Sequence, residues 1–131
     1  MSIVYDVDKK NGRVIAKFAD EDGKSTNDLW FSAIMRTLRK VDCTDLEWDT
    51  LLTIAKETLL AFPKKIGVAK LHPNDVFNEA VGKEVARKQL IMRFRKAQIH
   101  AMHKLVDITT QQAEMTTLRC IEKMKSLTKL P

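Results

Sequence analysis

Two imidazoles and a carboxylate fall on one face of a helix predicted near the middle of the chain. His100, His103 and Asp107 are three and four residues apart, which is the spacing of one helical face. Such a set has the ligand types that a divalent metal ion uses. The same face also carries three cations, which oppose the binding of a metal ion: Arg93, Lys96 and Lys104. We therefore expect a solvated polar face, with no metal and no cofactor.

Other residues that could do chemistry lack a catalytic context. Cys43 and Cys120 have no CxxC spacing and fall at apolar positions, which favours buried structural thiols. His72 precedes Pro73 in a predicted turn, where a capping or packing role is favoured over a catalytic one. The chain contains no GxxxxGK[ST], GxGxxG, HExxH or GxSxG motif. We predict that the protein is not an enzyme.

Positive charge is concentrated in one segment of the chain. Residues 83–104 contain seven Lys and Arg but one acid, Glu84, whereas the rest of the chain is balanced, so this segment accounts for the net charge of +6. An anionic partner would meet this segment first. We predict that five residues of one flank form the binding surface, for a protein or for a nucleic acid: Arg93, Lys96, His100, His103 and Lys104. A protein partner is favoured, because aromatic rings for stacking on bases are few and no helix-turn-helix pattern occurs.

The same predicted helix has apolar residues on two opposite sides. One side carries Leu90, Phe94, Ala97, Ala101 and Leu105, and the other carries Val85, Met92, Ile99 and Val106. A small domain covers one of these sides, so the second needs a partner or a chain segment that folds back after Thr110. We predict a homodimer with Val85, Met92, Ile99 and Val106 in its interface.

The predicted elements form one α+β domain that is mostly helical. Asn11-Gly12 between two strand-like segments predicts a β-hairpin over residues 3–18, and residues 66–71 are a candidate third strand. The hairpin is expected to pack against three or four helices, with one long central helix. Capping patterns and apolar spacing predict helices over residues 26–39, 45–62, 75–106 and 110–127. Whether the last two are continuous through Asp107-Ile108-Thr109-Thr110 is open.

Composition indicates a globular chain in a reducing compartment. The 131 residues fit one domain, and 44% hydrophobic residues suffice for a core. Two distant cysteines do not form the compact set of a disulfide-rich secreted domain. No apolar run reaches the ~18 residues of a membrane span, and the first residues lack the pattern of a signal peptide. We expect a cytoplasmic protein without a membrane partner.

Residues 67–86 resemble a segment of small accessory proteins of phages and prophages of Gram-positive bacteria. The shared pattern is a strand, then Pro73-Asn74-Asp75-Val76-Phe77, then Gly82 and Ala86 at the start of a helix. The resemblance implies a tight connection in which Asp75 caps the helix, Phe77 anchors its first turn and Gly82 allows close packing. It further implies a non-enzymatic inhibitor of a host or defence protein, like an anti-CRISPR protein, in the bacterial cytoplasm. The alternative is a nucleic-acid-binding protein that uses the basic helix.

Overall fold

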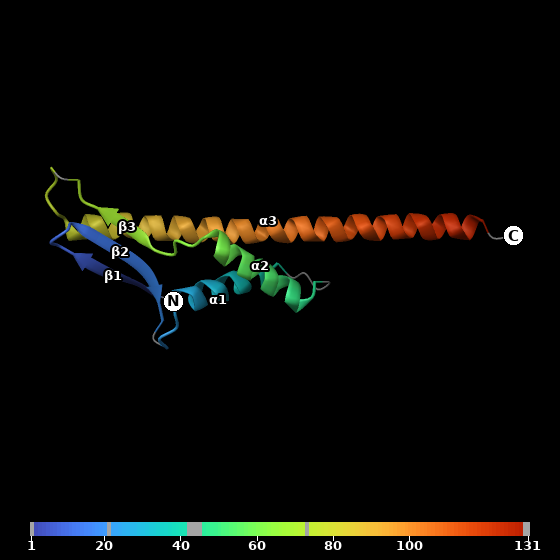
Figure 1. Cartoon of the computed structure of the whole chain (residues 1–131), viewed down its shortest axis with the longest axis horizontal. Helices are drawn as coiled ribbons and strands as arrows, with labels where there is room; N and C mark the ends of the chain where they lie inside the picture. Colours follow the sequence, from blue (N-terminus) through green and yellow to red (C-terminus); the bar gives the residue numbers. More distant parts are fainter. Residues whose placement is uncertain (1, 21, 42–45, 73, 130–131) are drawn as a thin grey trace.

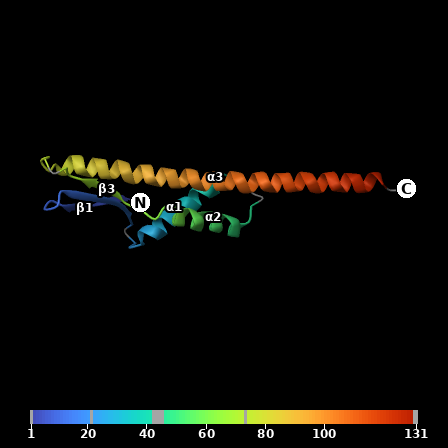
Figure 2. The same cartoon turned by 45° about the horizontal axis from the view of Figure 1, so that its top comes forward.

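The molecule is built along one long helix. The computed structural model describes residues 2–20, 22–41, 46–72 and 74–129. Along the chain its elements are β1 (Ser2–Asp8), β2 (Arg13–Ala19), α1 (Thr26–Arg39), α2 (Trp48–Ala61), β3 (Gly67–Lys70) and α3 (Glu79–Thr128). The sheet, α1 and α2 lie along one side of α3, and the C-terminal part of α3 extends beyond them (Figures 1 and 2). The predicted α+β class is confirmed.

The three strands form an antiparallel sheet in the order β1-β2-β3. In the turn of the predicted hairpin, Gly12 adopts a φ of 59°, which glycine reaches without a Cβ clash. The Asp8 carboxylate accepts hydrogen bonds from the Asn11 side chain at 2.8 Å and from its backbone N–H at 3.2 Å. These bonds lower the pKa of Asp8. β3 pairs with β2, with Val68 opposite Ile15. Both the hairpin and the candidate third strand are thus confirmed.

The two shorter helices pack beside the sheet. α1 has the predicted bounds, and the Ser25 hydroxyl caps it by accepting a hydrogen bond from the Asp28 N–H at 3.1 Å. α2 lies within the predicted range 45–62. At its C-terminal end the Lys65 ammonium donates to the carbonyls of Leu59 at 3.0 Å and Phe62 at 2.7 Å, which satisfies acceptors that the helix leaves free. Burial lowers the pKa of Lys65.

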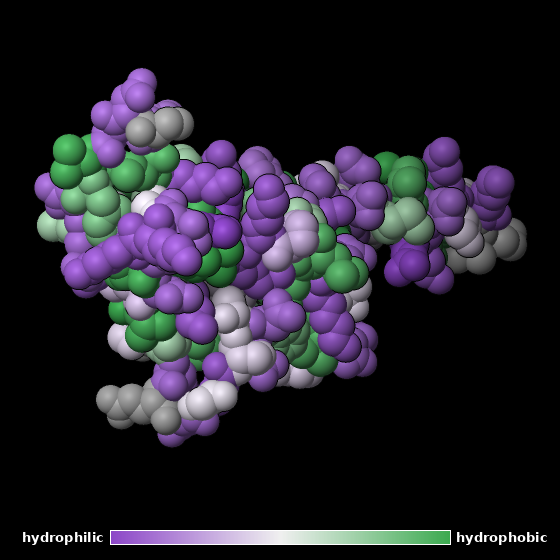
Figure 3. Space-filling view, turned by 60° about the vertical axis from the view of Figure 1, so that its left-hand side comes forward, coloured by the Kyte–Doolittle hydropathy of each residue, from purple (hydrophilic) through white to green (hydrophobic). Residues whose placement is uncertain are grey.

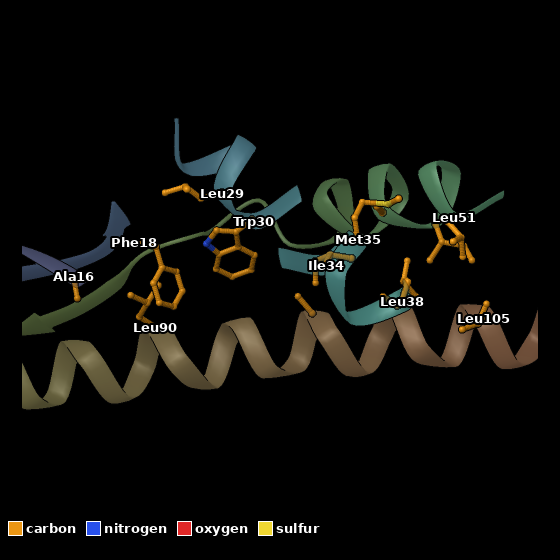
Figure 4. Packing of buried hydrophobic residues seen from close by; sticks show 14 of the residues in the cluster. Ala16, Phe18, Leu29, Trp30, Ile34, Met35, Leu38, Leu51, Leu90 and Leu105 are labelled. Carbon is orange, nitrogen blue, oxygen red and sulfur yellow. The ribbon is translucent and has the colours of Figure 1, made fainter. Parts of the chain in front are cut away.

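The hydrophobic core lies between α3 and the elements beside it. Alternate residues of β2, namely Val14, Ala16 and Phe18, are buried against α3, as expected for a strand with one face inward. Trp30 of α1 is fully buried and meets the Phe94 ring edge-on, with centroids 5.1 Å apart. Figure 4 shows Phe18, Trp30 and Leu90 close together above α3. These contacts join α1, the sheet and the long helix into one core.

Glycines let the sheet approach α3 closely. A Cβ on Gly67 would overlap the Ala86 carbonyl oxygen and lie 2.8 Å from the Leu90 nitrogen, both in the backbone of α3. A Cβ on Gly82 would lie 2.8 Å from Cγ2 of Val14. The close approach expected at Gly82 is confirmed, and Gly67 provides a tighter one from the sheet side.

The last two predicted helices are one, and its start was misplaced. α3 is a single helix of 50 residues that continues through residues 107–110. The Thr109 hydroxyl donates to the carbonyls of Leu105 and Val106, both at 3.0 Å, so the threonine is accommodated within the helix. The expected start at Asp75 is wrong: Asn78 caps α3 by accepting from the Val81 N–H at 3.1 Å. Phe77 does pack against the core, as expected.

Candidate interaction surface on the long helix

One apolar side of α3 is buried and the other is exposed. Its buried residues are Ala86, Leu90, Ala97, Ala101 and Leu105, and these face the sheet, α1 and α2. The opposite residues, which we call the outer stripe, are each about half exposed: Val85 (50%), Met92 (52%), Ile99 (56%) and Val106 (56%). The outer stripe therefore remains uncovered within the monomer.

Cations border the outer stripe near its middle. A shallow groove on this face is lined by three apolar residues, Ile91, Met92 and Ile99, and by four basic residues: Arg87, Lys88, Arg95 and Lys96. All four are exposed. Glu84 lies 3.5 Å from the Arg87 guanidinium and 3.8 Å from the Lys88 ammonium, at exposed positions where such pairs contribute little. The surface thus combines an apolar centre with a positive border.

The predicted basic strip is divided between two surroundings. Lys96 and His103 are exposed, and Lys104 is partly exposed. In contrast, Arg93 is half-buried and its guanidinium donates to the carbonyl of Ile66, just before β3. The predicted strip is therefore not one continuous binding surface.

His100 is held by the domain as well. Its Nδ1 lies 3.4 Å from the Thr58 hydroxyl, and its ring meets the Phe62 ring edge-on at 5.5 Å between centroids. Its contacts join α3 to the end of α2 and set it apart from His103, which is exposed. Within the described residues, no group of three or more His, Cys, Asp and Glu side chains is placed to hold a metal ion.

Sequence reasoning missed Arg87, Lys88 and Arg95 as members of the exposed surface. The signal was present: Lys88 lies four residues before Met92, and Arg95 lies three residues after it, so both flank the outer stripe on a helix. The predicted strip followed the other flank, which the loop before β3 partly covers.

Beyond residue 109, α3 has no domain beside it. Residues 110–128, which we call the projecting segment, are all exposed. Five large apolar residues of this segment are between 38% and 56% exposed: Met115, Leu118, Ile121, Met124 and Leu127. Figure 3 shows apolar side chains (green) among hydrophilic ones (purple) on the part of the molecule that extends away from the domain. The expectation of a buried Cys120 is wrong, because this residue lies in the projecting segment and is exposed. Cys43 lies outside the described residues.

A second hollow lies where the hairpin turn meets the start of α3. Its apolar lining includes Val14, Leu71, Phe77 and Val81. The titratable residues around it are Lys70, His72 and Asp75, and in the part of the chain that the structure describes their side chains form no hydrogen bond with one another.

Comparison of the chain with protein-family models, with curated proteins and with solved structures finds no match. The resemblance to phage accessory proteins therefore stays a prediction. Among the described helices, none is both long enough and apolar enough to cross a membrane.

Proposed function

We propose that this chain is a non-enzymatic binding protein that docks another protein on the outer stripe of α3. The observation that carries this proposal is the outer stripe itself, four large apolar residues in one line on a helix whose other side builds the core. A row of large apolar side chains on an exposed face is a feature of protein interaction sites. An apolar centre with a charged border is the usual composition of a protein–protein interface.

The positive border favours a partner with acidic residues around an apolar centre. Arg87, Lys88, Arg95 and Lys96 would steer such a partner and fix its orientation, whereas the outer stripe would supply most of the affinity. If the resemblance to phage accessory proteins holds, a host or defence protein is among the partners of this surface.

The same cations make nucleic acid the second candidate. Lys and Arg neutralise phosphates, and binding of that kind weakens steeply with salt. Phosphates and sugars would not cover the apolar side chains of Met92 and Ile99, which line the groove together with these cations. A protein partner therefore fits the whole surface, whereas a nucleic acid fits its border alone.

A photo-crosslinking residue at position 99 tests the proposal in cells that produce the protein. We expect covalent adducts with protein from position 99, and we expect Met92→Asp to remove them, because a carboxylate in the groove disfavours apolar docking. Leu60 is the matched control, since it is apolar and 83% exposed but lies on α2. Adducts with nucleic acid alone, or equal protein adducts from positions 60 and 99, would contradict the proposal.

A further inference from the structure

The projecting segment has the features of a helix that is stabilised by a partner. Its residues 110–128 are helical and exposed throughout. Threonines at positions 110, 116 and 117 have low helix propensity, so the sequence of this segment alone does little to stabilise the helix. Packing of an apolar face provides most of the stability of such helices in proteins.

We propose that the partner of the outer stripe is a second copy of this chain, whose projecting segment lies antiparallel along it. This inference rests on the proposed function, because it specifies which protein docks on the outer stripe. By symmetry, each copy then covers the outer stripe of the other. Each projecting segment gains a helix beside it, and the two domains lie on opposite sides of the helix pair.

The residue spacing supports an antiparallel pair. Alternating steps of four and three residues from Val85 (85, 89, 92, 96 and so on to 127) follow one continuous face of α3. The large residues of this face in the domain half are Val85, Met92 and Ile99, whereas the projecting half begins with Thr110, Ala113 and Thr117. An antiparallel arrangement places Met92 opposite Thr117 and Ile99 opposite Thr110, and a large side chain packs well against a smaller one. A parallel arrangement would instead place Met92 against Met92 and Ile99 against Ile99.

The charges also favour the antiparallel arrangement. Lys96 lies nine residues before Leu105 and Glu114 nine residues after it, so both have the same angular position on α3, at one edge of this face. His103 and Asp107 lie two residues before and after Leu105 at the same edge. An antiparallel pair centred near Leu105 therefore brings Lys96 of one copy opposite Glu114 of the other, twice in the dimer. Neither Lys96 nor Glu114 forms an ion pair among the described residues of the monomer.

The lengths of the two surfaces match. At about 1.5 Å per residue, the outer stripe from Val85 to Val106 is about 32 Å long and the projecting segment about 27 Å. The whole helix is about 75 Å long, and a contact strip about 10 Å wide has an area of about 750 Å². This is close to the about 800 Å² per partner of a stable interface.

Charge reversal tests this pairing without disturbing the core, because Lys96 and Glu114 are both exposed. We expect Lys96→Glu or Glu114→Lys alone to weaken dimerisation by at least about tenfold, since each variant places like charges opposite one another twice. The double variant with both changes restores the opposite charges and should dimerise like the unchanged protein. A mixture of the two single variants should form heterodimers, because position 96 of each copy then faces the opposite charge at position 114 of the other.

Sedimentation at several concentrations, with circular dichroism as a control for folding, measures these effects. A monomer of 15.0 kDa at all concentrations of the unchanged protein would overturn the inference but not the proposed function, which the adducts from position 99 test separately. A dimer that neither single variant weakens would also overturn the antiparallel register. Failure of the double variant to recover, with its circular dichroism unchanged, would contradict the pairing of Lys96 with Glu114.

Discussion

Trp30→Ala is expected to lower the free energy of unfolding by about 3–5 kcal/mol, the range for removing a large buried aromatic side chain. Trp30 is fully buried and has the largest of the fully buried side chains. Its ring contacts Phe94 of α3, and its centroid lies 6.4 Å from the centroid of the Phe18 ring of β2. One substitution therefore weakens the packing between α1, β2 and α3. Urea unfolding monitored by circular dichroism measures the loss. A loss below about 1 kcal/mol would contradict the role given to this residue.

Trp30→Phe is the matched control for this prediction. It keeps an aromatic ring in the core, and it removes the indole N–H, which is buried and has no hydrogen-bond partner among the described residues. An unsatisfied buried donor costs about 1–3 kcal/mol, so its removal offsets part of the volume lost. We expect the phenylalanine variant to lose much less stability than the alanine variant. If the two variants lose the same stability, the loss comes from removing the indole and does not depend on the size of the cavity.

The double variant Met92→Asp/Ile99→Asp is expected to abolish self-association while the domain stays folded. Both side chains are about half exposed in the monomer, so two carboxylates there are tolerated before association but would be buried against apolar groups after it. Light scattering should return the chain mass of 15.0 kDa, against twice that mass for the unchanged protein. Hydrogen exchange should become faster in residues 110–128, because the projecting segment has lost the helix beside it.

Leu60→Asp controls for the added charge, since Leu60 is 83% exposed and lies on α2. This variant should keep the mass and the exchange rates of the unchanged protein. If Met92→Asp/Ile99→Asp leaves the mass at twice that of the chain, the outer stripe is not the dimer interface. If the double variant unfolds the domain, the outer stripe is part of the core and not an exposed surface.

Local signals were sufficient for several elements. The Ser25 cap predicted the start of α1, because the hydrogen bond to the Asp28 N–H involves residues three apart. Asn11-Gly12 likewise predicted the hairpin, since the turn is stabilised by Asp8 and Asn11 themselves. The start of α3 was harder to predict, because Asp75 and Asn78 are both good helix caps. Its continuity was also harder to predict, because threonines at 109 and 110 fit a helix end as well as a helix interior.

The candidate surface depended on contacts that are distant in sequence. Arg93 donates to Ile66 and His100 contacts Thr58, and nothing in the spacing within α3 indicates either partner. The two apolar sides of α3 could be predicted from the residue spacing, and the prediction placed Val85, Met92, Ile99 and Val106 on the outer side, but the spacing gives no physical reason for that choice. Small residues determine which side of α3 faces the domain, because Ala86, Ala97 and Ala101 let the other elements approach the helix closely. The outer stripe has no small residue and stays outside.

A disulfide between two copies measures the central claim most directly. In a background with Cys43→Ser and Cys120→Ser, we would introduce Met92→Cys and Thr117→Cys together, positions that lie within one residue of directly opposite each other in an antiparallel pair centred near Leu105. A disulfide needs Cα atoms within about 7 Å. Met92→Cys alone is the control, because the two copies of position 92 would be about 38 Å apart along the pair.

Under mild oxidation we expect the double variant to form a product of twice 15.0 kDa, in which peptide mapping shows position 92 of one copy bonded to position 117 of the other. The single variant should remain unlinked. A bond between the two copies of position 92, or no bond between copies of the double variant, would contradict the account of α3 as a helix covered by the projecting segment of a second copy.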